Sequence, residues 1–164
     1  MNKENQSKIT ELIRQTKPLI FREMTHEKVM EKGAADYVTN VDVAVQNYLK
    51  EALEKEFPEI RLIAEEKENL GLNSRNSYWI LDPIDGTTNL IRDYHLSAVS
   101  LGLYENGEIT FGVVYNPFTE ELFYGAKGEG AYLNGAPIQV SNQPEFKDAV
   151  VSFGSSPYEK NRAK

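Results

Sequence analysis

Two aspartates three residues apart occur in the segment WILDPIDGTTN, residues 79–89, where a short apolar run gives way to a turn. One carboxylate is enough to cap such a turn, so the second acid needs a further reason. Two like charges about 4 Å apart cost roughly 4 kcal/mol at an effective dielectric constant of 20, so a cation should accompany them. Mg²⁺ prefers carboxylate and carbonyl oxygens and keeps water ligands that can act as nucleophiles. Asp82 and Asp85 are therefore predicted to bind Mg²⁺.

A second pair of acids, Glu65 and Glu66, directly follows the apolar run at residues 62–64. This run is a second candidate strand. If it lies beside the strand that precedes Asp82, then Glu65, Asp82 and Asp85 meet at one edge of a sheet. Glu66 is expected to face solvent, because adjacent side chains at a strand end point in opposite directions.

Residues 86–89, Gly-Thr-Thr-Asn, add groups that suit a phosphate. Glycine permits close approach of the backbone, and threonine or asparagine caps a helix that begins near Thr88. The first amide groups of a helix, together with its dipole, favour a bound anion. Metal ions on one side and amides on the other would hold a phosphoryl group between them. Judged by spacing alone, there is an alternative to a metal and phosphate site: DPIDG is an ordinary acidic turn, and TTN is an ordinary helix cap.

The elements that position these residues begin with helices. Apolar residues recur at helical spacing over residues 9–24, with Pro18 as a kink or a restart, which predicts one long or broken helix. A clearer helix covers residues 41–57, with a cap at Thr39 or Asn40. We expect this second helix to lie on a sheet.

The remaining candidate elements are strands, at residues 62–64, 78–81, 98–104, 109–115, 121–124 and 150–153. Pro83 favours a strand end where the acids begin. Asn106-Gly107 and Asn134-Gly135 each predict a tight hairpin, so the strands should pair largely antiparallel. Helices followed by meandering strands predict an α+β layered domain, with two N-terminal helices packed on a largely antiparallel sheet.

The composition restricts the partners. The chain has 164 residues and a net charge of −7, which disfavours binding to nucleic acid or to an anionic membrane. It has no cysteine and two histidines, so a metal site should consist of oxygen ligands. We find no signal peptide and no stretch of membrane-spanning length, so a cytoplasmic location is expected.

These residues resemble the inositol monophosphatase family of Mg²⁺-dependent, lithium-sensitive phosphatases. The resemblance rests on WILDPIDGTTN and extends to DYVTNVD at 36–42, LIAEE at 62–66 and the segment from SAVSLG to IQVS at 97–141. It covers essentially the whole chain. It implies that residues 1–164 form the N-terminal, metal- and phosphate-binding half of the family's layered αβαβα fold.

The resemblance also implies a ligand set for two Mg²⁺ ions. Glu65, Asp82 and the main-chain carbonyl of Ile84 would hold the first ion. Asp82 and Asp85 would hold the second, so that Asp82 bridges the two.

The same resemblance implies roles in catalysis and in substrate binding. Thr87 and Glu65 would orient the attacking water, and Asp42 would support Thr87 through a hydrogen bond. The amides of Gly86 and Thr87 would contact the phosphate. The implied substrate-binding residues are Glu65, Ile84, Asp85, Gly86 and Thr87.

The implied activity is hydrolysis of a small phosphorylated substrate by metal-activated water, with inositol monophosphate as the leading substrate. NADP, bisphosphorylated nucleotides and sugar phosphates stay open as alternatives. Members of the family are commonly dimers, so the resemblance implies a homodimer.

The chain departs from the family in one respect. The family's second signature, a Trp-Asp pair followed by small residues and glycine, supplies the remaining ligand of the second metal. Trp79 is the only tryptophan here, and Ile80 follows it. We therefore expect the first half of a family member, without its C-terminal domain, and an exposed apolar sheet face where the other half would pack. The alternative function is a catalytically incomplete domain for metal binding or association.

Overall fold

The computed structural model describes residues 1–26, 29–33, 36–64 and 76–152. The helices in these ranges are α1 (Lys3–Arg14), α2 (Thr16–Met24), α3 (Asn40–Glu56), α4 (Thr87–Ile91) and a short 3₁₀ helix, η1 (Phe146–Asp148). The strands are β1 (Val29–Gly33), β2 (Asp36–Thr39), β3 (Arg61–Ala64), β4 (Tyr78–Asp85), β5 (Ala98–Glu105), β6 (Glu108–Asn116), β7 (Glu121–Ala126), β8 (Gly130–Leu133) and β9 (Ala136–Ile138).

The N-terminal helix, predicted to be either continuous or broken, is broken. The break is at Gln15 and not at Pro18. Pro18 lies in the first turn of α2, where an N–H has no partner within the helix and its loss costs little. The hydroxyl of Thr16 donates to the carbonyl of Ile13 at 2.6 Å and joins the two helices.

The main sheet has seven strands in the order β3-β4-β5-β6-β7-β8-β9. The pair β3–β4 is parallel and the other pairs are antiparallel, so the predicted largely antiparallel sheet is confirmed. Both Asn-Gly hairpins are confirmed too, with positive φ at Asn106, Gly107, Asn134 and Gly135. A separate hairpin of β1 and β2 was not predicted.

Two strand predictions are wrong. Strand β4 does not end at Leu81 but continues to Asp85. Residues 150–152 lie in no strand, and among the described residues no strand pairs with the exposed Val150 and Val151. Phe153 lies outside the described residues. Strands β8 and β9 escaped prediction because they are short and mostly exposed, which leaves little hydrophobic alternation.

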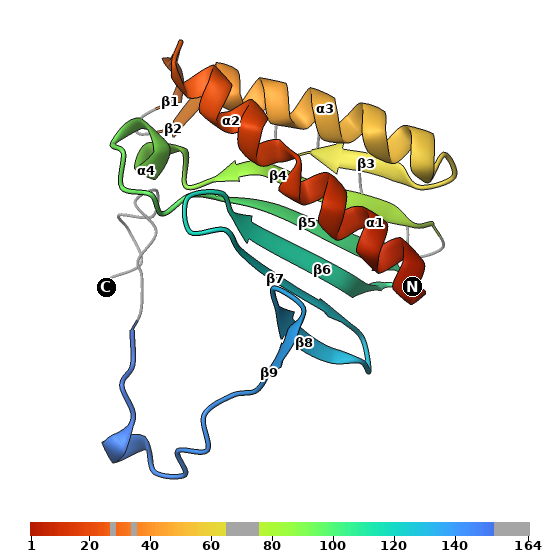
Figure 1. Cartoon of the computed structure of the whole chain (residues 1–164), viewed down its shortest axis with the longest axis vertical. Coiled ribbons are helices and arrows are strands. Elements are labelled where there is room, and N and C mark those ends of the chain that lie inside the picture. The colour runs from red at the N-terminus through yellow and green to blue at the C-terminus, as the bar shows by residue number, and fades with distance from the viewer. Residues whose placement is uncertain (27–28, 34–35, 65–75, 153–164) are drawn as a thin grey trace.

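The helices α1, α2 and α3 cover one face of the sheet (Figure 1). Helix α3 contacts β3 and β4, while α1 contacts β6 and β7. The core between these layers includes Trp79, Leu81, Leu101, Phe111 and Val113. The α+β layered class is therefore confirmed. In the described part of the chain, no helix is both long and apolar enough to cross a bilayer.

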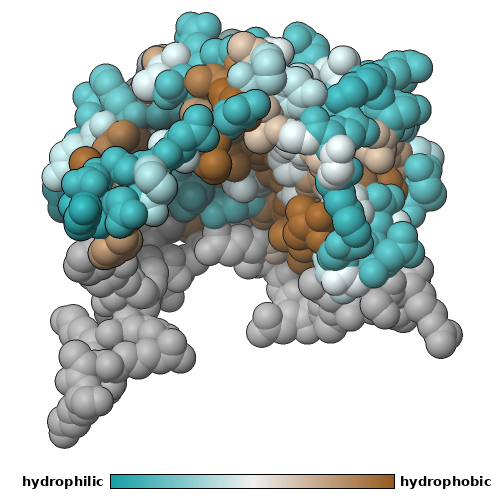
Figure 2. All heavy atoms as spheres, turned by 90° about the horizontal axis from the view of Figure 1, so that it is seen from below, coloured by the Kyte–Doolittle hydropathy of each residue, from teal (hydrophilic) through white to brown (hydrophobic). Residues whose placement is uncertain are grey.

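The opposite face of the sheet is not covered by any described helix. Figure 2 shows the molecule hollowed on one side, with hydrophobic residues reaching the surface inside the hollow. This is the exposed apolar face that the sequence led us to expect.

Candidate metal and phosphate site

The two aspartates of β4 lie on one face of the sheet because of a β-bulge. Asp82 pairs with Ser100 of β5 and Asp85 with Ala98, with a register shift between the two pairs. Three steps along β4 thus match two steps along β5. Residues two apart on a strand share a face, whereas residues three apart normally do not. The extra residue of the bulge therefore brings Asp82 and Asp85 to the same side.

Pro83 explains how β4 continues past the predicted end. Its side chain is buried at the bulge, a position where proline is tolerated because the ladder there lacks a regular hydrogen bond. On the other side of β4, the paired part of β3 ends at Ala64, opposite Leu81. The side chain of Ile84 is 3% exposed and belongs to the core, which fixes the position of its main-chain carbonyl.

Gly86 occupies the turn that leads into α4. Its φ of 83° and ψ of 43° are left-handed, and a Cβ there would lie 3.1 Å from both the Asn89 Nδ2 and the Leu96 carbonyl oxygen. Ser97 Oγ donates to the Gly86 carbonyl at 2.9 Å, and Asn89 Nδ2 donates to the Leu96 carbonyl at 2.9 Å. Only glycine fits this turn without strain.

The helix predicted near Thr88 is present, but its cap differs from the prediction. Helix α4 begins at Thr87, its N-cap is Gly86, and no side chain caps it. The side chain of Asn89, expected as a cap, holds the loop that follows the helix.

Asp42 and Thr87 meet although 45 residues separate them in sequence. The Thr87 hydroxyl lies 3.2 Å from Asp42 Oδ1 and 3.1 Å from the Ile84 carbonyl oxygen. The other carboxylate oxygen, Oδ2, accepts from the Thr39 amide at 2.8 Å and from the Thr39 hydroxyl at 2.6 Å. Thr39 and Asp42 form a capping box at the start of α3.

Burial dominates the electrostatics of Asp42, which is 3% exposed. It raises the pKa of the carboxyl above its ordinary value, against the opposing effect of hydrogen bonds from Thr39 and Thr87. The hydrogen-bond donors thus favour the charged form of the Asp42 carboxyl, whereas its burial favours the neutral form.

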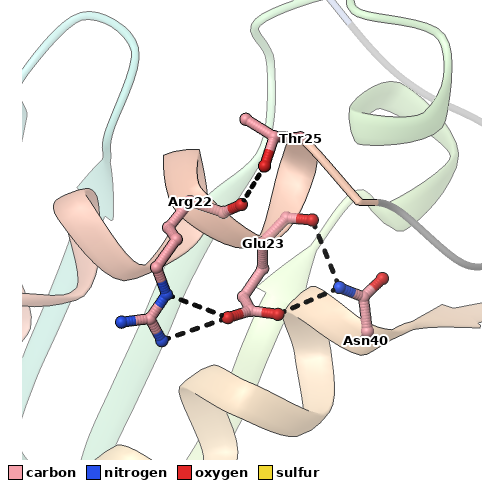
Figure 3. A network of polar contacts seen from close by, with 4 residues as sticks. All are labelled: Arg22, Glu23, Thr25 and Asn40. Carbon is pink, nitrogen blue, oxygen red and sulfur yellow. Dashed lines mark hydrogen bonds and ion pairs between the residues drawn. The ribbon is translucent and has the colours of Figure 1, made fainter.

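A polar network fixes the start of α3 against the end of α2 (Figure 3). Asn40 Nδ2 donates to the main-chain oxygen and to Oε2 of Glu23, each at 3.2 Å. The Arg22 guanidinium donates twice to Glu23 Oε1 at 3.1 Å. Hydrogen bonds from Asn40, and then from Arg22, lower the pKa of Glu23. The network thus anchors Asn40, which lies in the first turn of α3 together with Asp42.

The predicted site residues thus fall into three groups. The structure brings Thr87 into contact with Asp42 and with Ile84, next to Gly86 in the turn, and it places Asp82 and Asp85 on one face. Glu65 lies outside the described residues. Among the described residues there is no group of three or more His, Cys, Asp or Glu side chains that could hold a metal. The ligand set therefore stays a prediction.

Three residues that support the site were not predicted to do so. Ser97 and Asn89 hold the turn at Gly86, and Thr39 holds Asp42 as well as capping α3. The spacing Thr-x-x-Asp at residues 39–42 is a capping-box pattern and could have indicated the contact with Thr39. No local pattern indicates the contacts of Ser97 and Asn89.

Comparison with known proteins identifies the family. The model of the inositol monophosphatase family matches residues 1–163. The chain belongs to the inositol monophosphatase family.

One similar relative is the fructose-1,6-bisphosphatase/inositol-1-monophosphatase of Aquifex aeolicus, which is 39% identical over 134 residues; the match covers 82% of this chain and 50% of the relative. Among solved structures, an IMPase/NADP phosphatase complexed with NADP and Ca²⁺ matches with a TM-score of 0.82 at 30% identity, over 89% of this chain and 56% of that one. An IMPase/NADP phosphatase complexed with Mg²⁺ and phosphate matches with a TM-score of 0.76 at 31% identity, over 82% and 52%. The chain thus spans about half the length of these relatives.

Proposed function

We propose that this chain carries the metal- and phosphate-binding half of a Mg²⁺-dependent phosphomonoesterase. The observation that carries the proposal is the β-bulge, which puts Asp82 and Asp85 on one face directly before the Gly86 turn. Family membership supports a phosphatase. The related structure with Mg²⁺ and phosphate supports metal-dependent catalysis in the family.

The donor set of the proposed site suits Mg²⁺. Asp82, the Ile84 carbonyl, Asp85 and, from the sequence, Glu65 offer only oxygen atoms, the ligands that this hard cation prefers. In the proposal Asp82 serves both ions and Asp85 the second. A bound Mg²⁺ would polarise the phosphoryl group and lower the pKa of a water ligand.

Thr87 would aim the attacking water. A hydroxyl has one hydrogen, and two acceptors compete for that of Thr87: Asp42 Oδ1 at 3.2 Å and the Ile84 carbonyl at 3.1 Å. An Ile84 carbonyl engaged as a metal ligand is the weaker acceptor, so the hydroxyl then donates to Asp42. Its lone pairs are left to accept a hydrogen from the water that Glu65 would also orient.

The phosphate would lie against the Gly86 turn. The first amide groups of α4 have no partner within the helix, and glycine lets an anion approach the backbone closely. In the proposal the amides of Gly86 and Thr87 contact the phosphate. We propose inositol monophosphate as the substrate, with lithium as an inhibitor, as the family resemblance implies.

A second candidate function is a domain that binds metal weakly or serves in association. It is the alternative function that the sequence left open.

Two measurements test the proposal: phosphate release from inositol 1-phosphate with and without Mg²⁺, and Mg²⁺ binding by titration calorimetry. Both are made on the 164-residue chain alone and on the chain co-expressed with the unmatched half of the Aquifex aeolicus relative. We expect Mg²⁺-dependent release at least in the co-expressed preparation. Asp82→Asn should lower that rate by at least a hundredfold, because it removes the acid that serves both ions.

Asp148→Asn is the matched control, since Asp148 is exposed in η1, far along the chain from the proposed ligands. It should leave release and Mg²⁺ binding unchanged. Release that is unaffected by Asp82→Asn or by a chelator would rule out the proposed mechanism. Feeble Mg²⁺ binding with no release in either preparation would favour the second candidate.

A further inference from the structure

The dipeptide Asn-Gly occurs twice in the chain, and each occurrence forms the tight turn of a hairpin. Asn106-Gly107 joins β5 to β6, and Asn134-Gly135 joins β8 to β9. Both asparagines have positive φ, 53° and 50°, and both are exposed, so water reaches each of them. The two turns are thus alike in sequence, in backbone conformation and in exposure.

Hydrogen bonds hold the side chain of Asn134. Its Oδ1 accepts from Arg14 Nη2 at 2.7 Å and from the main-chain amide of Leu122 at 3.1 Å. The amide of Asn134 donates in turn to the Leu122 carbonyl at 2.9 Å. Arg14 belongs to α1, which contacts β6 and β7 (Figure 1), and its guanidinium carbon also lies 5.8 Å from the centre of the Tyr115 ring. This turn is therefore fastened both to a helix and to a neighbouring strand.

The side chain of Asn106 is not held in this way. In the described part of the chain it makes no hydrogen bond. The carboxylates that flank the turn are engaged with other groups, Glu105 with the Thr110 hydroxyl and Glu108 with Lys127. The carboxamide of Asn106 is therefore free to rotate.

An asparagine followed by glycine can lose its side-chain amide in an intramolecular reaction. The main-chain nitrogen of the glycine gives up its proton and attacks Cγ of the asparagine. A bond forms between this nitrogen and Cγ, the bond between Cγ and Nδ2 breaks, and the side-chain nitrogen leaves with the proton as ammonia. One water molecule then opens the five-membered succinimide to aspartate or to isoaspartate. Glycine favours the attack because it has no side chain to hinder the approach.

We propose that Asn106 is a site of spontaneous conversion to isoaspartate and aspartate, and that its contacts protect Asn134 from the same reaction. The attack requires the asparagine side chain to rotate toward the next main-chain nitrogen while the turn opens. At Asn106 this movement breaks no side-chain hydrogen bond. At Asn134 it breaks the bonds from Arg14 and Leu122, and each bond that is lost lowers the population of the open state.

The conversion changes the tip of the β5–β6 hairpin. Either product adds a carboxylate between Glu105 and Glu108, where like charges repel. Isoaspartate also adds one carbon to the main chain, in a turn whose geometry depends on two positive φ values. Asp82 and Asp85 pair with the other end of β5. The conversion should therefore loosen the hairpin and leave the proposed metal ligands in place, so the inference does not depend on the proposed function.

Peptide mapping by mass spectrometry tests the proposal on the full chain. The folded protein and the protein unfolded in urea are aged in the same mildly alkaline buffer, and conversion at residues 106 and 134 is followed with time; fragmentation distinguishes isoaspartate from aspartate. In urea the two sites should convert at similar rates, because glycine follows both. In the folded protein Asn106 should convert at least about tenfold faster than Asn134, because two hydrogen bonds hold the second side chain.

Arg14→Met removes one of these two bonds and should raise the rate at Asn134 severalfold while leaving the rate at Asn106 unchanged. Arg61→Met is the matched control, because Arg61 lies on β3, at the opposite edge of the sheet from β9; it should change neither rate. Asn106 is an internal reference, since a general loss of stability would speed the reaction at both sites.

Two results for the wild type would overturn the proposal: conversion of Asn134 as fast as that of Asn106 in the folded protein, or conversion of both sites in urea and of neither in the folded protein. This comparison needs no variant, so it holds whether or not Arg14→Met folds. An unchanged rate at Asn134 in Arg14→Met, or equal acceleration at both sites, would overturn the protective role of Arg14.

Discussion

The contact between Asp42 and Thr87 gives the sharpest test of the site, because it joins two distant segments through one hydrogen bond. Asp42→Ala removes the acceptor for the Thr87 hydroxyl and for the amide and hydroxyl of Thr39. Thr87→Val keeps the side-chain shape and removes the hydroxyl. The double-mutant cycle of these two substitutions isolates the energy of their interaction.

The expected magnitudes follow from the bonds lost. Thr87→Val should cost about 1 kcal/mol, because its bond to Asp42 is long and the hydroxyl is partly buried. Asp42→Ala should cost about 2–4 kcal/mol, since it leaves three donors without an acceptor but also relieves the burial of a charge. If the hydroxyl donates to Asp42, the double variant should be less destabilised than the sum by about 1 kcal/mol.

Urea unfolding at neutral pH measures these differences, provided that the denaturant dependence stays the same among the variants. Thr110→Val is the matched control, because its hydroxyl donates to Glu105 at 2.7 Å between β5 and β6. Its change in the free energy of unfolding should add to that of Asp42→Ala without coupling. A coupling within about 0.3 kcal/mol of zero would refute the reasoning, because Asp42 would then not hold Thr87.

Two further predictions concern the same region. Burial raises the pKa of Asp42 above 3.8, so the native state binds this proton more tightly than the unfolded chain does. The free energy of unfolding of the wild type relative to that of Asp42→Asn should therefore fall as pH rises from about 4 to 7. A urea midpoint of the wild type that rises over this pH range relative to that of Asp42→Asn would contradict the prediction. Gly86→Ala should cost about 1–3 kcal/mol because it combines a left-handed φ with close contacts at 3.1 Å, whereas Gly112→Ala should not destabilise. Equal thermal midpoints for the two alanine variants would refute the assigned strain.

Much of the fold could be predicted because its signals are local. The Asn-Gly pairs fix hairpins through positive φ, and the apolar period of residues 41–57 fixes a helix. The strand expected at 150–153 is absent over its described residues, 150–152, because β-branched residues form a strand only where a partner strand is available. Local composition cannot report that partner.

The candidate site divides in the same way. The strand-turn-helix arrangement that contains Asp82, Asp85, Gly86 and Thr87 could be predicted, because its signals lie within one short segment. The continuation of β4 and the cap at Gly86 could not, because the register with β5 and the contacts of residues 96 and 97 decide them.

The sequence by itself determined which chemical groups this protein has, in what order, and to which family they belong. Only the tertiary structure decided how they face one another. The bulge against β5 turns two acids to one side of the sheet, and the packing of α3 brings Asp42 to Thr87 across 45 residues. Register and packing depend on contacts between distant segments, which no local pattern of residues contains.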